Sequence, residues 1–194
     1  MKKYRIGIVG ATGAVGQEII SLLEKREFPV AEARLLASAN SAGRQIQACG
    51  NLETIQETTA DSFKDLDIAI FSAGSKQSLE FAEASRQHGC VVIDNSSAFR
   101  MDPLVPLIVP EINPEDLEKH QGIIANPNCS TIGMLVALKP IYDAVGIDRI
   151  NVATYQAVSG TGKAAIEELA GQTARLLNGK PAEPDIYPSQ IAFN

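Results

Sequence analysis

The sequence predicts an α/β fold with a parallel sheet at its centre. Apolar runs of strand length alternate with amphipathic segments of helix length from residue 4 onward, which is typical of βαβ units. A glycine-rich turn joins the first predicted strand to the first predicted helix. The composition, with 45% apolar and 21% charged residues, is that of a globular chain and excludes intrinsic disorder.

The elements of this sheet are predicted from two periodicities. Strands are expected where apolar residues run together, and helices where they recur every three or four positions. The predicted strands are 4–9, 33–37, 67–71 and 90–93, the predicted helices are 14–25 and 75–88, and a helical turn is expected near 61–64. Gly89 fits the C-terminal cap of the second helix.

The pattern changes after the fourth strand. Five of the ten prolines lie between Pro103 and Pro127, which indicates a domain boundary, so we expect domains over 1–127 and 128–194. In the second domain we predict helices over 131–142 and 163–177, a long strand over 149–158 and a loop-like end. These elements stop without a closing element. We therefore expect the first part of a longer protein, or a natural truncation.

Charge and hydropathy exclude several classes of protein. With 17 Lys and Arg against 23 Asp and Glu, the net charge of −6 argues against a nucleic-acid binder, which needs a basic face. The longest apolar stretches are interrupted within about ten residues, well short of the ~20 that span a membrane. Three cysteines without CxxC spacing indicate reduced thiols. We expect a cytoplasmic protein with no metal, membrane or nucleic-acid partner.

Glycines occupy every third position from Gly7 to Gly16, where the first predicted strand meets the first predicted helix. Glycine lets the backbone approach a diphosphate closely, and a helix N-terminus supplies N–H donors and the positive end of a dipole. This GxxGxxG spacing in this context predicts a dinucleotide site in a Rossmann-like domain. The alternative is a tight strand-to-helix turn without a ligand.

The end of the second predicted strand bears on the choice of dinucleotide. An NAD site usually has an acidic residue about 20 positions after the glycines, which binds the ribose 2′-hydroxyl. Residues 35–44 contain no acid and offer hydroxyls, an amide and Arg44 instead. This composition favours NADP, and the alternative is a polar loop selected for its turn chemistry.

Cys129 follows Asn128 immediately before a predicted apolar helix. The N-terminal end of a helix stabilises a thiolate, which is a nucleophile, and Asn128, the Ser130 hydroxyl and nearby backbone N–H groups could hold an oxyanion. Cys49 and Cys90 are interpreted as incidental or packing residues. The alternative for Cys129 is likewise a structural cysteine.

A nucleophilic cysteine beside a nicotinamide site predicts aldehyde chemistry. The thiolate adds to an aldehyde, hydride leaves to the nicotinamide, and a nucleophile releases the resulting thioester. A base must move the protons. The two histidines, His88 and His120, each fall at a predicted helix end near a glycine, where a capping or surface role is expected.

Six motifs, in this order, resemble the aspartate-semialdehyde dehydrogenase family, and the resemblance covers essentially the whole chain. The motifs are residues 10–16, 71–75, 94–100, 109–113, 127–131 and 155–160. The resemblance implies a Rossmann-like domain followed by the start of an α+β catalytic and dimerisation domain, in a cytoplasmic homodimer or tetramer. It implies reversible NADPH-dependent reduction of L-aspartyl-4-phosphate to L-aspartate 4-semialdehyde and phosphate, a step towards diaminopimelate and lysine, threonine and methionine.

The resemblance also implies roles for individual residues. Cys129 would be the nucleophile, Asn128 would lie near the oxyanion, and Gln156 would orient the substrate. Arg100 would bind the substrate phosphate, for which a guanidinium fork is suited. The residues implied in cofactor binding are Gly10, Thr12, Gly13, Ala14, Val15, Gly16, Ser38, Ser41, Ser72, Ala73, Gly74, Ser159 and Gly160.

The chain departs from the family's pattern in two places. Asn40 stands where many members have arginine, which removes a cation from the expected 2′-phosphate site and leaves NAD as an alternative. The chain also stops where the family continues with the acid/base histidine and an arginine for the substrate carboxylate, so the isolated chain is not expected to complete the reaction. The open alternatives are a related acyl-phosphate or acyl-thioester reductase and a truncated, non-catalytic nucleotide-binding fragment.

Overall fold

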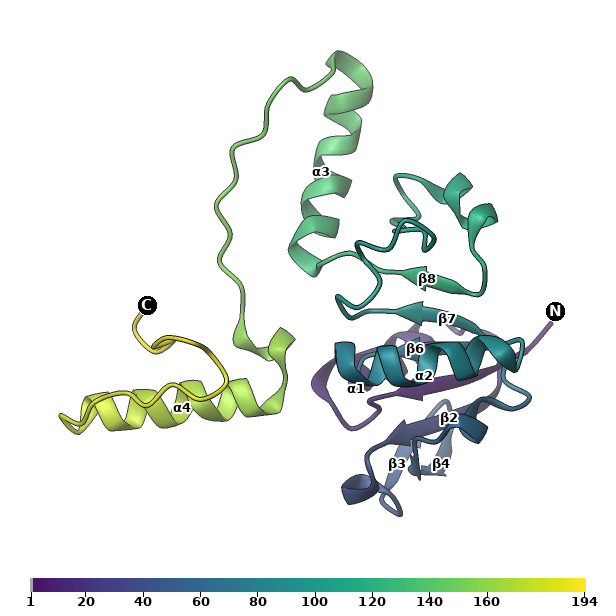
Figure 1. Ribbon diagram of the computed structural model, residues 1–194, viewed down its shortest axis with the longest axis horizontal. Helices are drawn as coiled ribbons and strands as arrows, with labels where there is room; N and C mark the ends of the chain where they lie inside the picture. Colours follow the sequence, from purple (N-terminus) through teal and green to yellow (C-terminus); the bar gives the residue numbers. More distant parts are fainter. Residues whose placement is uncertain (1) are drawn as a thin grey trace. The chain divides into compact units, whose positions relative to one another are not determined.

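The computed structural model describes residues 2–194, which divide between Val152 and Ala153 into two compact units. The first unit is built on a six-stranded sheet in the order β5-β2-β1-β6-β7-β8 (Figure 1). Its strands are β1 (Tyr4–Val9), β2 (Val30–Ala37), β5 (Gln56–Glu57), β6 (Ile68–Phe71), β7 (Val91–Asp94) and β8 (Ile123–Ala125). All neighbours pair in parallel, which confirms the predicted α/β fold and its Rossmann-like domain.

Helices cover both faces of this sheet. Helix α1 (Ala14–Lys25) joins β1 to β2, and α2 (Ser75–Gln87) joins β6 to β7. Right-handed crossovers that run in opposite directions along a sheet place their helices on opposite faces. Two apolar clusters match this arrangement: Ile6 and Ile8 pack with Ile20 of α1, whereas Phe71 packs with Ala82 of α2. In Figure 1, α2 crosses in front of the strands.

Several short elements were not predicted from the sequence. An antiparallel hairpin, β3 (Gln45–Ala48) and β4 (Asn51–Thr54), follows the 3-10 helix η1 (Ala39–Ser41), and η3 (Pro114–Lys119) precedes β8. The helical turn expected near 61–64 is confirmed as η2 (Ala60–Phe63). Gly89 follows the C-terminal end of α2 with a φ of +75°, as predicted for its cap.

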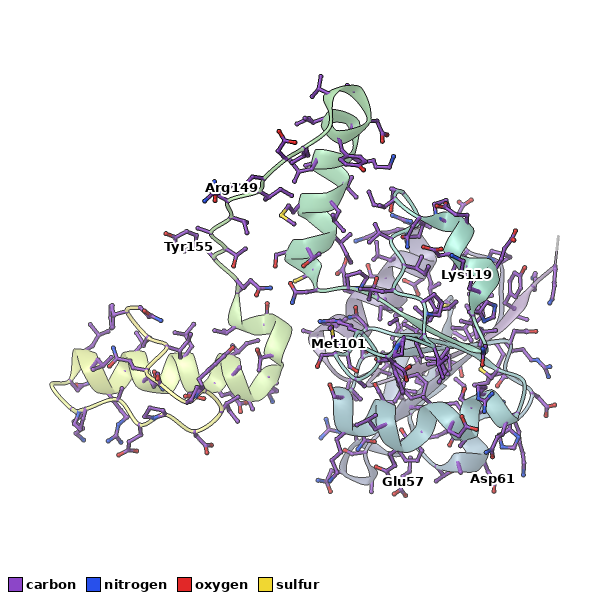
Figure 2. All side chains as sticks on the ribbon, turned by 45° about the horizontal axis from the view of Figure 1, so that its top comes forward. Glu57, Asp61, Met101, Lys119, Arg149 and Tyr155 are labelled. Carbon is purple, nitrogen blue, oxygen red and sulfur yellow. The ribbon has the colours of Figure 1, made fainter. Side chains whose placement is uncertain are left out.

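Helix α3 (Cys129–Val145) begins two residues before the predicted start and continues past Pro140. It is strongly apolar, yet no helix among residues 2–194 is long and apolar enough to cross a membrane. The strand predicted over 149–158 is wrong. Residues 149–157 belong to no strand, and Figure 2 labels Arg149 and the fully exposed Tyr155 on this segment. A strand forms only where its N–H and C=O groups pair with a neighbour, and within residues 2–194 this segment has no pairing strand.

The second unit consists of η4 (Val158–Thr161), α4 (Lys163–Leu177) and an irregular C-terminal segment. Helix α4 was predicted with these bounds. The segment after it folds back because two side chains of α4 bind its backbone. The Glu168 carboxylate accepts N–H groups from residues 185–187, and the Gln172 side-chain oxygen accepts those of Ile191 and Ala192.

Candidate active site

Most of the predicted site residues follow the carboxyl ends of strands in the first unit. In a parallel sheet these ends share one edge, and ligands bind where the strand order reverses, here between β1 and β6. At this edge β2 leads into Ser38 and Ser41, β1 into Gly10–Gly16, β6 into Ser72–Gly74, β7 into the loop that carries Arg100, and β8 into Asn128 and Cys129. The sheet order therefore brings these five segments to the same edge.

The turns after β1 and β6 touch each other at the reversal point. The Ser72 N–H and hydroxyl both donate to the carbonyl oxygen of Val9, at 2.8 and 2.9 Å. Gly10 has a φ of +89°, and a Cβ there would lie 2.9 Å from the Ser72 carbonyl carbon. A Cβ on Gly16 would lie 2.2 Å from the carbonyl oxygen of Gly10. Glycine is thus required at positions 10 and 16 for the close packing of strand, turn and helix.

The N-terminus of α1 offers donors to an anion. Its first helical hydrogen bond runs from the N–H of Gln17 to the carbonyl oxygen of Gly13, at 3.0 Å. The N–H groups of residues 14–16 therefore have no partner inside the helix. Gly13 is the N-cap without a capping side chain, and the first turn contains no acidic residue. This geometry fits the pyrophosphate of a dinucleotide, because oriented N–H groups and the helix dipole favour negative charge.

The end of β2 fits the adenosine side of such a ligand. Ser38 caps η1 and accepts the N–H of Ser41 at 2.9 Å through its carbonyl oxygen. Asn40 and Arg44 are exposed nearby in the chain. Residues 38–44 thus offer hydroxyl, amide and guanidinium groups that can bind a phosphate, whereas the carboxylate of Glu57 comes from β5, where Glu57 pairs with Ala37.

The Arg100 side chain joins the loop after β7 to the turn after β8 by hydrogen bonds. Its Nε donates to the carbonyl oxygen of Asn126 at 2.9 Å, and its Nη2 donates to the carbonyl oxygen of Asn95 at 3.1 Å. The side chains of these two asparagines are also joined, because Asn126 Nδ2 donates to Asn95 Oδ1 at 2.6 Å. Two of the five guanidinium N–H groups are used in this way, and a guanidinium can use others to bind an anion.

Cys129 is the first residue of α3 and is exposed. Asn128 is the N-cap, and its Oδ1 accepts the N–H of Ser130 at 3.1 Å and the Ser130 hydroxyl at 2.6 Å. The sulfur of Cys129 lies 3.9 Å from the same oxygen. The sequence Asn-Cys-Ser thus caps the helix with Asn128 and places the thiol at the positive end of the helix dipole.

The other two cysteines have different surroundings. Cys90 is buried, and burial raises the pKa of its thiol. Partial burial, together with the charges of Glu24 and Glu53, also raises the pKa of Cys49. A raised pKa keeps a thiol protonated and weakens it as a nucleophile. Of the three thiols, only that of Cys129 combines exposure with a helix N-terminus.

The remaining candidates lie elsewhere. His88 is the C-cap of α2, and His120 follows η3 and accepts the N–H of Gly122 through Nδ1 at 3.1 Å. Both histidines precede the strands β7 and β8, so they lie at the amino edge of the sheet. Gln156, Ser159 and Gly160 belong to the second unit, where Gln156 precedes η4 and the other two lie within it.

Sequence reasoning assigned no role to Asp94, Asn95 and Asn126, although they lie at the same carboxyl edge. Asn95 and Asn126 hold Arg100, and the N–H of Asn126 donates to the carbonyl oxygen of Asp94 at 2.8 Å. These three residues could have been found from the sequence, because polar residues directly after a strand are where ligand-binding residues of parallel sheets occur.

The fold and the candidate site are those of a dinucleotide-binding protein with an exposed cysteine at the ligand-binding edge of its sheet. The parallel sheet has helices on both faces, and a glycine turn lies where its strand order reverses. The chain belongs to the semialdehyde dehydrogenase family. The family's model of the NAD binding domain matches residues 5–120, and its model of the dimerisation domain matches residues 138–194.

Individual relatives agree with this membership. The chain is 54% identical to aspartate-semialdehyde dehydrogenase 2 of Vibrio cholerae over 195 aligned positions, covering 100% of this chain and 58% of that protein. The crystal structure of aspartate semialdehyde dehydrogenase II from Vibrio cholerae, complexed with ASA, superposes with a TM-score of 0.92 at 54% identity and the same coverages. The enzyme from Candida albicans with NADP has a TM-score of 0.62 at 28% identity, covering 74% of this chain and 48% of that chain.

The chain therefore spans somewhat more than half the length of the relatives that it matches. The two family matches leave residues 121–137 between them, whereas the compact units divide after Val152. The domain boundary that we expect at 127/128 remains a prediction.

Proposed function

We propose that this chain forms the cofactor-binding part and the nucleophile of an aspartate-semialdehyde dehydrogenase, which reduces L-aspartyl-4-phosphate with NADPH to L-aspartate 4-semialdehyde and phosphate. The observation that carries the proposal is the exposed thiol of Cys129 at the N-terminus of α3, with Arg100 bound to the turn that precedes it. The high identity to the Vibrio cholerae enzyme, whose structure is a complex with ASA, supports the choice of substrate.

The chain's own residues can perform the acyl transfer. The sulfur of Cys129 would attack the acyl carbon, a C–S bond would form, and the C–O bond to phosphate would break with its electron pair leaving on phosphate. Arg100 would bind the departing phosphate, and the first N–H groups of α3 with the Asn128 amide would hold the oxyanion. NADPH, when bound, supplies the hydride that reduces the thioester. Breakage of the C–S bond would then return the electron pair to Cys129 and release the aldehyde.

The cofactor proposed is NADP. The N–H groups of Thr12, Ala14 and Val15 would bind its phosphates, with Gly13 in close contact with them, and the Ser38–Ser41 segment would meet its adenosine end. The absence of an acid from residues 35–44 supports NADP over NAD, as does the NADP complex of the Candida albicans relative. Ser72, Ala73 and Gly74 would line the nicotinamide side. For Ser159 and Gly160 the proposal of a role in cofactor binding rests on the resemblance to the family.

The remaining assignments rest on the family. We propose that Gln156 orients the substrate and that the protein is a cytoplasmic homodimer acting in lysine, threonine and methionine synthesis. The match of residues 138–194 to the dimerisation domain supports the dimer.

The test compares two variants that make the same atomic change, Cys129→Ser and Cys49→Ser, in the complete gene product that contains these residues. NADPH formation is followed from L-aspartate 4-semialdehyde, phosphate and NADP⁺. Cys129→Ser should lower kcat by about 10³-fold or more without changing NADPH affinity, and Cys49→Ser should resemble the wild type. Substantial turnover by Cys129→Ser would show that another group is the nucleophile.

A further inference from the structure

Asp94 is the last residue of β7, and it is completely buried. A carboxylate is costly to bury unless hydrogen bonds replace its water. The Ser78 hydroxyl donates to Oδ1 at 2.6 Å, the Ser96 hydroxyl donates to Oδ2 at 2.8 Å, and the Ser96 N–H lies 3.2 Å from Oδ1. Both oxygens are therefore hydrogen-bonded, by Ser78 from helix α2 and by Ser96 two residues further along the chain, and nothing in the proposed chemistry uses this acid.

The two serines connect different parts of the site. Ser78 lies in the first turn of α2, and its N–H donates at 3.2 Å to the carbonyl oxygen of Gly74, which is the N-cap. Ser96 lies in the loop that leads to Arg100, and its hydroxyl oxygen accepts the N–H of Ala98 at 3.0 Å. The Asp94 carboxylate thus ties the start of α2 to the Arg100 loop.

The main chain of Asp94 extends this connection to the cysteine turn. Its carbonyl oxygen accepts the N–H of Asn126 at 2.8 Å, and the carbonyl oxygen of Asn126 accepts Nε of Arg100. Both carbonyl groups that hold Arg100, those of Asn95 and Asn126, therefore belong to residues bonded directly to Asp94, one through the chain and one through a hydrogen bond. A shift of Asp94 would move the guanidinium relative to Cys129.

We propose that Asp94 is a positioning residue which, through Ser78 and Ser96, sets the loop 95–100 so that Arg100 presents its guanidinium to the substrate phosphate beside Cys129. The inference rests on the proposed function, because it assigns the anion at Arg100 as the phosphate of the acyl phosphate. Asp94 touches neither substrate nor cofactor and acts only by holding Arg100.

The structure offers a matched pair of variants on α2. Ser78 and Ser85 are both completely buried on this helix, seven residues apart and so on the same face. Ser78 binds Asp94, whereas the hydroxyl of Ser85 lies beside the Cys90 thiol near the other end of the helix. Ser78→Ala and Ser85→Ala remove the same atom from equally buried sites, but only Ser78→Ala removes the hydrogen bond that joins the Asp94 carboxylate to α2.

The experiment measures the KM for phosphate in the reverse direction, the KM for NADP⁺ and the thermal unfolding midpoint in the complete gene product. Ser78→Ala and Asp94→Asn should raise the phosphate KM by about 10-fold to 100-fold, the scale at which a misplacement of 1 Å acts. Ser85→Ala should leave the phosphate KM unchanged, even if it lowers the unfolding midpoint as much as Ser78→Ala does. Ser96→Ala should likewise raise the phosphate KM, whereas Ser96→Thr, which keeps the hydroxyl, should have a phosphate KM close to that of the wild type. A phosphate KM that moves equally in Ser78→Ala and Ser85→Ala would overturn the proposal.

A second readout does not depend on turnover. Phosphate should protect Cys129 from iodoacetamide, with modification located by peptide mass, and Ser78→Ala should raise the protecting phosphate concentration by the same factor. Wild-type protein without dehydrogenase activity but with this protection pattern would refute the proposed function alone. Equal protection in wild type and Ser78→Ala, or no protection by phosphate in either, would refute the positioning role of Asp94.

Discussion

Replacing Gly16 by alanine tests the close packing of α1 on the glycine turn. The added Cβ would lie 2.2 Å from the carbonyl oxygen of Gly10 and 2.9 Å from Cα of Ala11, both backbone atoms that no rotamer change can move. Helix and turn must separate by most of an ångström. Alanine inside a helix normally gains about 0.5–1 kcal/mol over glycine, but overpacking costs about 1–3 kcal/mol. We expect a net loss of about 1–2 kcal/mol, or about 2–8 °C in the unfolding midpoint at 2–4 °C per kcal/mol.

The matched control is Gly133→Ala, the same change in the interior of α3 of the same unit, where an added Cβ meets nothing within 4 Å. It should gain about 0.5–1 kcal/mol. Calorimetry gives the unfolding midpoints, and nicotinamide fluorescence gives the dissociation constant of NADPH. Gly16→Ala should weaken NADPH by about tenfold or more, because the N–H donors of α1 move with the helix. If Gly16→Ala were stabilised like Gly133→Ala and bound NADPH normally, the packing argument would be refuted.

Three further predictions concern the cofactor, the anion and pH. Asn40→Arg should tighten NADPH relative to NADH by about tenfold, since a charge-assisted hydrogen bond contributes about 1.5–3 kcal/mol; an unchanged ratio of the two dissociation constants would place the 2′-phosphate elsewhere. Arg100→Ala should raise the phosphate KM by about 10-fold to 100-fold, with partial recovery in Arg100→Lys, and an unaltered KM would remove Arg100 from the anion site. The N–H of Arg5 donates to Asp67 at 2.8 Å and holds the pKa of that carboxyl below its usual value. The resulting stability is present above the unfolded pKa of the carboxyl and is lost as pH falls below about 4. The free energy of unfolding, measured in urea at a series of pH values, should therefore fall less steeply at acid pH in Asp67→Asn than in the wild type. Identical pH dependence of the two proteins would contradict the assignment.

The sequence predicted the elements whose periodicity is strong. β1, α1, β6, α2 and α4 were expected within a residue of their observed bounds, because each has an apolar run or face set off by glycine or polar residues. The hairpin β3–β4 was missed. Its strands are largely polar on one face, and its turn is Cys49-Gly50 rather than the usual Asn-Gly, although both residues have positive φ, at +51° and +84°.

The local motifs of the candidate site could be recognised in the sequence, whereas the hydrogen bonds that connect them could not. Cys129, Asn128 and the glycine turn lie in local motifs whose chemistry follows from a helix N-terminus. The carboxylate of Asp94 gave no such signal, because Ser78 comes from a separate segment that only the folded sheet brings to it, although Ser96 is only two residues away along the chain. Periodicity also could not show that residues 149–157 would be unpaired, since pairing depends on a neighbouring strand and not on the pattern of the segment itself.

Strand order explains how the thiol and the glycine turn, far apart along the chain, can serve one ligand. Neighbouring strands lie about 4.8 Å apart, so β8 lies about 15 Å across the sheet from β1. A pyrophosphate on the N-terminus of α1 would have β2 on one side and β6 and β7 on the other. An extended dinucleotide would then direct its adenosine towards β2 and its nicotinamide towards β6 and β7, with the Cys129 thiol at the start of α3, which follows the next strand, β8. The adenosine, pyrophosphate and nicotinamide sites and the thiol would thus follow one another in the spatial order of the strands, β2-β1-β6-β7-β8. This order differs from the order in the sequence because the chain returns to the centre of the sheet after β5.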